Sequence, residues 1–315
     1  MEKPHILQIG PYPDWDQQPL ETAFTMHRLD RALDKPAFLA RIGPLIRGIA
    51  ARGTHTVARD MIEACPNLEI IAVYGVGYDG VDLKACRDHG VRVTNTPDVL
   101  TGDVADLGVA MMLCQSRQMI AAERWVRDGS WAAKGGFVLT RRVYGARAGI
   151  LGLGRIGLQV ARRLAAFDMD IAYSDLGPNA DAPDFAFVAD PVNLARRSDV
   201  LFVTLAATKA THHIVGKSVI EALGPEGLLI NISRASNIDE IALLDALETG
   251  ALGAAALDVF DGEPKLNPRF LGLDNVLLQP HHASGTVETR KAMGQLMRDN
   301  LAAHFAGQPL LTPVH

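Results

Sequence analysis

The stretch GILGLGRIG, residues 149–157, decides the fold. Gly152, Gly154 and Gly157 have the G-x-G-x-x-G spacing, which here follows an apolar, strand-like run and opens an amphipathic helix pattern. In that context the first glycine permits a tight turn, the second lets the backbone approach a pyrophosphate, and the third lets the helix pack closely on the sheet. The stretch therefore predicts a dinucleotide-binding turn rather than a simple glycine-rich loop.

The residues around this turn indicate which dinucleotide it would hold. Arg155 and Ile156 lie in the first helical turn, where main-chain N–H groups favour an anion. Asp175 ends the next strand-like run, and no Lys or Arg follows it before Arg196. A carboxylate at that place accepts hydrogen bonds from the ribose hydroxyls of NAD and repels the 2′-phosphate of NADP. The sequence predicts NAD in preference to NADP.

Bulk composition excludes several classes of function. The chain has 315 residues, of which 48% are hydrophobic and 21% charged, as is typical of a soluble globular protein of one or two domains. A net charge of −5 argues against a nucleic-acid or anionic-membrane partner. Neither a signal peptide nor an apolar run of membrane-spanning length is evident. The three cysteines are scattered, so we expect no disulfide framework, no metal site and a reducing cytoplasm.

Strand-like and helix-like runs alternate along most of the chain, a pattern typical of a mostly parallel α/β sheet. We expect two doubly wound domains, Rossmann- and flavodoxin-like, with a cleft between them. Residues 97–284 would form the NAD-binding domain, and residues 1–96 plus 285–315 a discontinuous substrate-binding domain. The expected strands lie at 5–10, 68–74, 91–94, 148–152, 170–175, 199–206, 227–233, 253–260 and 275–281; the expected helices include 103–119, 155–167 and 286–306, with a break at 129–136.

Three polar residues stand at the ends of late strand-like runs. Arg234, Glu263 and His281 each follow such a run, and the carboxyl edge of an open α/β sheet is where ligands bind. Hydride transfer to a 2-oxo acid needs a proton donor for the forming alkoxide and a cation for the carboxylate and carbonyl. A His oriented by a carboxylate supplies the first, and an Arg supplies the second. Taken singly, each of these residue types more often has a structural or surface role, and only their combination at three strand ends favours this reaction.

At this point the sequence resembles the D-isomer-specific 2-hydroxyacid dehydrogenases, over most of its length. The resemblance implies reduction of a small 2-oxo acid to the D-2-hydroxy acid with a nicotinamide cofactor. It is strongest for the branch of glyoxylate/hydroxypyruvate and hydroxyphenylpyruvate reductases, so an aryl 2-oxo acid is the alternative substrate. The segments that carry it are GVGYDGVDL (75–83), VRVTNTPDVLTGDVADLGVAMML (91–113), GILGLGRIG (149–157), LLINISRASNIDE (228–240), AALDVFDGEP (255–264) and LLQPHHASGTVETR (277–290).

The resemblance assigns roles to individual residues of the later segments. Arg234 is similar to the substrate-binding Arg, Glu263 to the catalytic carboxylate, and His281 to the acid–base His of the family. Asp258 resembles the residue that bonds the nicotinamide carboxamide. His282 adjoins His281, and the PH-x-x-SGT pattern favours His281 as the acid–base group.

The earlier segments would contribute substrate contacts and a subunit interface. The main chain of Val76 and Gly77 resembles a loop that holds the substrate carboxylate, and Arg52 lies where the family has another substrate-side loop. The apolar helix at 103–119 is a candidate element of a homodimer, with burial inside one subunit as the alternative. Trp131 lies in a region where aromatic residues of the resembled branch reach the neighbouring subunit's site.

The chain departs from the family pattern at two places, and other functions compete with a reductase. Ala235 stands where the family usually has Gly, and the segment LAATKATHH (205–213) replaces a usual His/Pro pair near the adenosine. Formate dehydrogenase relatives carry Gln where this chain has Glu263. A dinucleotide-sensing interaction protein and a catalytically silent scaffold are the alternatives from other classes. The silent scaffold is not favoured, because Arg234, Glu263 and His281 are all present. The sensing protein, which would keep these three residues, is not favoured because no long disordered tail is evident in the sequence.

Overall fold

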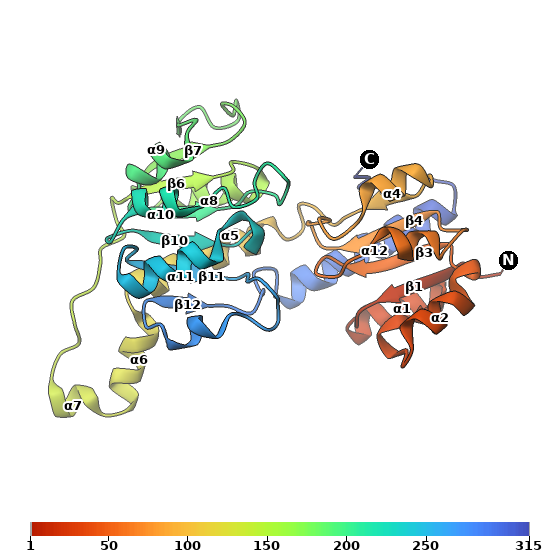
Figure 1. The fold of residues 1–315 in the computed structure, drawn as a ribbon, viewed down its shortest axis with the longest axis horizontal. Helices are drawn as coiled ribbons and strands as arrows, with labels where there is room; N and C mark the ends of the chain where they lie inside the picture. Colours follow the sequence, from red (N-terminus) through yellow and green to blue (C-terminus); the bar gives the residue numbers. More distant parts are fainter. Residues whose placement is uncertain (1, 315) are drawn as a thin grey trace. The chain divides into compact units, whose positions relative to one another are not determined.

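Two compact units make up the structure, a computed structural model that describes residues 2–314. Unit 2 is the continuous segment Thr101–Ala283, and unit 1 combines the chain up to Leu100 with the chain from Ser284 onward. The chain thus crosses between the units twice, after Leu100 and after Ala283 (Figure 1). The sequence-based division had set these boundaries at 96/97 and 284/285. Among residues 2–314 no helix is long and apolar enough to cross a membrane.

Unit 2 is built on a seven-stranded parallel sheet in the order β12-β11-β10-β9-β6-β7-β8. Connections run outward in both directions from β6, so the strand order reverses between β6 and β9. A reversal of this kind is the topological switch point at which doubly wound sheets bind ligands. The prediction of a doubly wound parallel sheet is confirmed. The strands are β6 (Arg147–Leu151), β7 (Asp170–Ser174), β8 (Ala186–Phe187), β9 (Val200–Val203), β10 (Leu228–Asn231), β11 (Ala254–Leu257) and β12 (Val276–Leu278).

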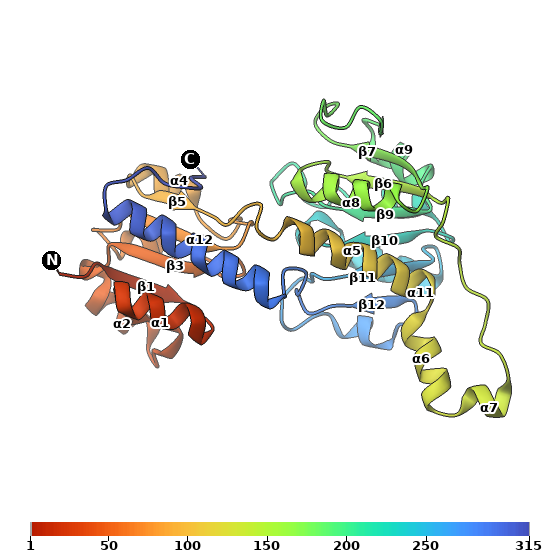
Figure 2. The same ribbon diagram turned by 180° about the vertical axis from the view of Figure 1, so that it is seen from behind.

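Helices cover both faces of this sheet, as Figures 1 and 2 show from opposite sides. Helices α5 (Thr101–Ser116) and α8 (Arg155–Ala165) contact each other on one face. On α5, Val104, Ala105, Gly108, Val109, Met111 and Met112 are buried, so packing inside unit 2 accounts for much of its apolar character. The other face carries α9 (Pro191–Arg196), α10 (Lys217–Leu223) and α11 (Glu240–Thr249). A short 3₁₀ turn, η3 (Ala235–Asn237), precedes α11, and η4 (Pro268–Gly272) precedes β12.

An arm extends from the end of α5 and reaches away from the sheet of unit 2 (Figure 2). It consists of α6 (Met119–Arg127), α7 (Ser130–Lys134) and the following segment up to β6. The sequence-based expectation of a break at 129–136 is wrong, because α7 occupies most of it. Gly129 and Gly135 flank this short helix at φ +79° and +84°. The two glycines suggest a loop, and a five-residue helix between them is too short to show a periodic pattern in the sequence.

Unit 1 contains a five-stranded parallel sheet in the flavodoxin-like order β2-β1-β3-β4-β5. Its strands are β1 (His5–Ile9), β2 (Thr25–Arg28), β3 (Gly48–Arg52), β4 (Ile70–Tyr74) and β5 (Arg92–Thr94). The long C-terminal helix α12 (Val287–Phe305) contacts α1 (Asp14–Ala23) and β4 on one face. On the other face, side chains of the strands pack with α2 (Lys35–Ile42), α3 (Arg59–Glu63) and α4 (Leu83–Asp88) around Leu7, Ile49, Ile71 and Val93. The 3₁₀ turns η1 (Leu29–Arg31) and η2 (Gly43–Leu45) flank α2.

Candidate cofactor and active site

The glycine turn between β6 and α8 has the shape that a dinucleotide pyrophosphate requires. Gly152 lies at φ +92°, and a Cβ there would meet Leu205 Cδ2 at 2.9 Å. At Gly157 a Cβ would lie 2.1 Å from the carbonyl oxygen of Gly152, so any side chain would separate the helix from the turn. Gly154 precedes α8 without a side-chain cap, and no atom of the described chain apart from its immediate chain neighbours lies within 4 Å of its Cβ position. The turn is therefore open at the point where the backbone would approach a phosphate, and the residues present fit the cofactor.

Asp175, at the end of β7, is bonded to this turn. Its Oδ2 accepts a hydrogen bond from the N–H of Leu153 at 2.7 Å, and its Oδ1 accepts one from the N–H of Leu176 at 2.7 Å. The carboxylate thus lies beside the glycine turn at the switch-point edge of the sheet. Its position suits the ribose-binding role expected of it, and it also holds the turn in place.

Two further residues that the sequence analysis did not single out support the turn. Thr204, directly after β9, donates from its hydroxyl to the carbonyl oxygen of Gly152 at 2.5 Å. Asn179 donates from its side chain to the carbonyl oxygen of Leu153 at 2.9 Å. The position of Thr204 after the strand across the switch point is a signal that could have identified it. Asn179 lies in an irregular loop, where spacing gives no such signal.

His281 and Glu263 form a hydrogen-bonded pair at the carboxyl edge of the same sheet. Nδ1 of His281 lies 2.7 Å from Oε2 of Glu263, and the two side chains are 30% and 28% exposed. Oε1 of Glu263 accepts a second hydrogen bond from the N–H of Phe260 at 2.8 Å. Burial acts to raise the pKa of Glu263, but these two hydrogen bonds, with the charges of His281 and Arg234, hold it below its ordinary value. Glu263 is therefore an ionised, oriented partner for the imidazole at neutral pH.

Asp258, at the end of β11, is buried and bonded to the main chain that follows His281. Its Oδ1 accepts from the N–H of His282 at 2.7 Å, and its Oδ2 accepts from the N–H of Ala283 at 3.0 Å. Burial raises the pKa of Asp258 by more than these two hydrogen bonds lower it. The side chain of His282 is exposed, whereas that of His281 contacts Glu263.

Arg234 follows β10 and lies close enough to Glu263 for its charge to lower the pKa of that carboxyl group. Its Nη1 donates to the carbonyl oxygen of Ser233 at 2.8 Å, and its own carbonyl oxygen accepts from Asn231 Nδ2 at 3.0 Å. These bonds orient the start of the turn η3. The structure thus brings Arg234, Glu263 and His281 together, because β10, β11 and β12 are neighbours and all end at one edge.

The expected substrate-side residues of unit 1 also gather at the ends of neighbouring strands. Arg52 ends β3, and its Nη1 donates to the carbonyl oxygen of Pro11 at 3.5 Å, across the β1/β3 switch point. At Gly53 a Cβ would lie 3.1 Å from the carbonyl oxygen of Gly77, so the loops after β3 and β4 touch through their main chains. Asn95 donates to the carbonyl oxygen of Val76 at 2.9 Å. The Val76–Gly77 loop is thereby tied to the segment that follows β5.

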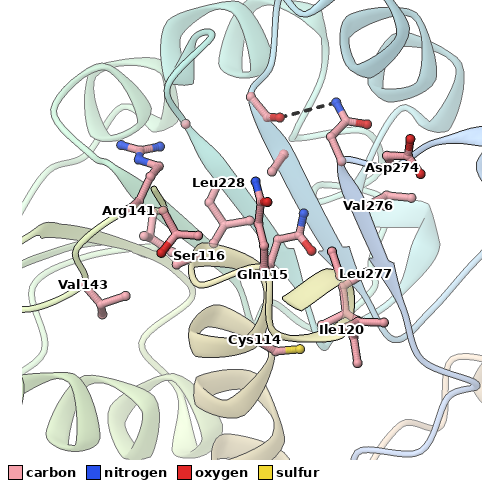
Figure 3. Close-up of a pocket in the computed structure, with 18 of the residues that line it drawn as sticks. Cys114, Gln115, Ser116, Ile120, Arg141, Val143, Leu228, Asp274, Val276 and Leu277 are labelled. Carbon is pink, nitrogen blue, oxygen red and sulfur yellow. Dashed lines mark hydrogen bonds between the residues drawn. The ribbon is translucent and has the colours of Figure 1, made fainter. Parts of the chain in front are cut away.

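A large groove in unit 2 lies at the opposite edge of the sheet from the glycine turn. Its volume is about 1290 Å³, and it is lined by the end of α5, by α6 and by the segment after α7. Figure 3 shows Gln115 and Ile120 lying close to Leu228 and Leu277, near the amino ends of β10 and β12. Open α/β sheets bind cofactors at the carboxyl ends of their strands, so this groove is not the cofactor site.

Comparison with known proteins agrees with this geometry. Residues 109–283 match the family described as D-isomer specific 2-hydroxyacid dehydrogenase, NAD binding domain. A hydroxyphenylpyruvate reductase of Plectranthus scutellarioides is 44% identical, with both chains covered completely. The crystal structure of a 2-hydroxyacid dehydrogenase from Ketogulonicigenium vulgare Y25 is 70% identical, with a TM-score of 0.94, 100% of this chain and 99% of that chain covered.

A further similar structure is an NADPH-dependent glyoxylate/hydroxypyruvate reductase from Sinorhizobium meliloti in complex with NADP and malonate. It is 40% identical, with a TM-score of 0.92, 99% of this chain and 97% of that chain covered.

Proposed function

Because this chain belongs to the D-isomer-specific 2-hydroxyacid dehydrogenase family, we propose that it acts on a small 2-oxo acid. The protein is an oxidoreductase that reduces a 2-oxo acid to the 2-hydroxy acid with a nicotinamide dinucleotide. Glyoxylate and hydroxypyruvate are the proposed substrates, with an aryl 2-oxo acid such as hydroxyphenylpyruvate as the second candidate. The single observation that carries the assignment is the His281–Glu263 pair, beside Arg234, on the sheet that carries the glycine turn.

Each polar group of this edge has a defined task in the proposed reaction. The bound dinucleotide supplies the hydride. His281 gives a proton from Nε2 to the oxygen that becomes the hydroxyl group, while its Nδ1 stays bonded to Glu263. Glu263 stabilises the imidazolium that donates this proton. Arg234 binds the substrate carboxylate and polarises the carbonyl group, as a charged donor at a developing alkoxide does.

Three residues of unit 1 are further proposed substrate contacts. The main-chain N–H groups of Val76 and Gly77 hold the carboxylate, and Arg52 reaches the substrate tail from the end of β3. Both loops lie at the carboxyl edge of the unit 1 sheet and touch each other, which supports a shared ligand. The guanidinium of Arg52 lies at the switch point between β1 and β3, where it would favour a polar group on the substrate tail.

For the cofactor, NAD is proposed in preference to NADP. Gly152, Gly154, Arg155, Ile156 and Gly157 would hold the pyrophosphate. Asp175 would bond the ribose hydroxyls, whereas the contact of Asp258 with the nicotinamide carboxamide, which the family resemblance implies, competes with the two main-chain hydrogen bonds that its oxygens accept. The loop after Asp175 carries acidic residues and no Lys or Arg before Arg196, so it offers no cation to a 2′-phosphate. The S. meliloti relative is NADPH-dependent, which makes this preference a sharp test of Asp175.

A homodimer is proposed, with the arm of unit 2 covered by a second copy. None of the nine residues of α6, all of them described, is buried, and its apolar Met119, Ile120 and Val126 are each more than half exposed. Trp131 on α7 is 61% exposed, and Leu139 beyond it is fully exposed. So much apolar surface on a projecting element is typical of a subunit interface. Trp131 would enter the neighbouring subunit's site.

A reducing compartment, the cytoplasm, is proposed on the basis of the thiols. Cys65, Cys86 and Cys114 are all free, and burial raises the pKa of both Cys65 and Cys86 to about 11. Such thiols are inert packing groups that no disulfide constrains.

The test is an initial-rate assay of NADH and NADPH oxidation at saturating cofactor. The panel contains glyoxylate, hydroxypyruvate, pyruvate, phenylpyruvate and 4-hydroxyphenylpyruvate. We expect the highest kcat/KM for glyoxylate or hydroxypyruvate with NADH. A preference for the aryl acids would select the second candidate. An absence of turnover with every pair, in a protein that still binds NADH, would overturn the substrate proposal.

A further inference from the structure

The main chain at His281 is held in an unfavourable conformation. His281 has φ +52°, in the left-handed region that non-glycine residues rarely adopt. In that region the Cβ of an L-residue comes too close to the carbonyl oxygen that follows it. Such a conformation persists only where the surrounding structure fixes it, and it is found most often at functional sites. Some contact must therefore hold the peptide units next to His281.

Asp258 makes that contact. Its two carboxylate oxygens bond the N–H groups of His282 and Ala283, the two peptide units that follow His281 in the chain. Asp258 is 1% exposed, so it carries its charge away from water, where an unpaired carboxylate would be strongly unfavourable. Burial indeed raises its pKa. A buried carboxylate with both oxygens on consecutive N–H groups has the geometry of a clamp on this turn.

Two carboxylates from one short segment thus hold His281 in two different ways. Glu263 holds the ring through Nδ1, and Asp258 holds the main chain immediately after the residue. The segment between them is itself fixed, because the N–H of Asp261 donates to Glu240 Oε2 at 3.0 Å. The charged groups that face one another here are Asp258, Glu263, His281 and Arg234.

We propose that Asp258 is a positioning residue for His281, acting through the main chain of His282 and Ala283 rather than through the reacting atoms. The proposal rests on the proposed function, since it requires His281 to be the proton donor. It differs from the role of a nicotinamide-carboxamide ligand, which would act on the cofactor. In the structure both oxygens of Asp258 already have amide donors, which a clamp requires and a cofactor ligand does not.

The experiment separates the two roles in the full-length enzyme. Asp258→Asn keeps the size of the side chain but sets an NH₂ group against one of the two N–H donors. We expect kcat to fall about 100-fold, the loss that a displacement of about 1 Å can cause in a catalytic group. The Kd of NADH, measured by fluorescence without turnover, should change less than threefold. Asp261→Asn, in the same segment and exposed, is the matched control and should keep normal kinetics.

A double-mutant cycle provides the readout that a general structural defect would not produce. If Asp258 acts only through His281, then Asp258→Asn should cause no further loss in a His281→Asn background. In the oxidation direction, the fold-loss of kcat that Asp258→Asn causes relative to wild type should be the same with NAD and with its 3-acetylpyridine analogue, which lacks the carboxamide nitrogen. Asp258→Glu, which keeps the charge but moves the carboxylate, is the second variant and should also lose kcat.

The proposal would be overturned if Asp258→Asn lowered kcat further in the His281→Asn background. It would also be overturned if the loss of kcat in Asp258→Asn disappeared with the 3-acetylpyridine analogue, or if the Kd of NADH rose by the same factor as kcat fell. Failure of the proposed function itself would be seen separately, because His281→Asn alone would then retain kcat.

Discussion

Nδ1 of His281 lies 2.7 Å from Oε2 of Glu263, although 18 residues separate the two in the sequence. The parallel order of β11 and β12 brings their carboxyl ends side by side, and the segments that follow these strands carry the two residues. Because the bond uses Nδ1, it leaves Nε2 as the ring nitrogen that would meet a substrate. The relationship supports an acid–base role for His281 and gives a direct test of it.

Replacing His281 by Asn should lower kcat by a factor of about 10² to 10⁴, the contribution of a general acid. The amide of Asn can occupy the site of the ring but cannot transfer a proton at neutral pH. Steady-state kinetics with the preferred 2-oxo acid and cofactor provide the measurement.

His282→Asn is the matched control for this variant. The side chain of His282 is exposed, and its main-chain N–H, which bonds Asp258, is kept in the variant. We expect kcat within threefold of the wild-type value. A normal kcat in His281→Asn together with a large loss in His282→Asn would reverse the assignment of the two histidines.

The lowered pKa of Glu263 predicts a pH dependence of stability. The fold favours the ionised carboxylate, so its contribution is fully present above the unfolded value of about 4.3. The contribution is lost as the pH falls through the lower, folded value. The difference in Tm between wild type and Glu263→Gln should therefore stay constant from pH 7 to 5 and narrow below about pH 4.3. Calorimetry at a series of pH values would measure it.

Glu240 provides a control of opposite sign. Burial raises its pKa, so the fold favours its protonated form. Relative to Glu240→Gln, the wild type should gain stability as the pH falls through the raised, folded value. A constant difference for both variants over the whole range would contradict the two pKa directions.

Asp175 should determine the choice of cofactor. Its carboxylate is held beside the glycine turn by the N–H groups of Leu153 and Leu176, so it cannot easily move away from a 2′-phosphate. We expect kcat/KM with NADH to exceed that with NADPH at least tenfold, and Asp175→Ser to reduce this ratio about tenfold, or 1.4 kcal/mol. Asp181→Ser, an exposed acid of the same loop, should leave the ratio unchanged. A wild-type preference for NADPH would refute the role of Asp175.

Gly294 tests the packing of unit 1. A Cβ at this position of α12 would lie 1.8 Å from Oδ1 of Asp16, a buried side chain of α1 that forms an ion pair with Arg298. Gly294→Ala should therefore lower the free energy of unfolding by about 1–3 kcal/mol. Gly272→Ala is the control, since no atom of the described chain outside its own helical turn and its chain neighbours lies within 4 Å of that Cβ position. Urea unfolding of both variants would show the difference, and equal stability would contradict the close α1–α12 contact.

The sequence predicts the fold and the candidate site best where a pattern repeats or where residues follow strong strands. Unit 2 has long apolar strands and a spaced glycine motif, so its order and its switch-point residues could be expected. Strands β2 and β3 of unit 1 were not expected, because β2 is short and only partly buried and β3 is a five-residue run that begins at Gly48. The hydrogen bonds of Asp258 with the main chain of His282 and Ala283 could not be predicted either, because every residue except proline has a main-chain N–H and the residue type gives no signal.

The arm of unit 2 leads to a prediction about assembly. Leu139 is 100% exposed on the segment after α7, beside the groove at the amino ends of the strands. If a second copy covers it, Leu139→Asp buries an unpaired charge and should raise the dimer dissociation constant at least tenfold. Leu33→Asp changes an equally exposed leucine, 106% exposed in unit 1, and should leave a dimer intact. Sedimentation velocity over a range of concentrations distinguishes the two.

Trp131 extends this prediction from assembly to catalysis. Its side chain is 61% exposed on α7, a projecting element that contacts α6. Trp131→Ala should raise KM for the 2-oxo acid several-fold while the Kd of NADH stays normal, because the indole would contact substrate across the dimer. Mixing Trp131→Ala with the inactive His281→Asn gives a hybrid in which one site combines wild-type His281 with wild-type Trp131 from the partner. We expect that hybrid to recover a normal KM in part of its sites. Unchanged KM in Trp131→Ala, or a wild type that sediments as a monomer, would contradict a shared site.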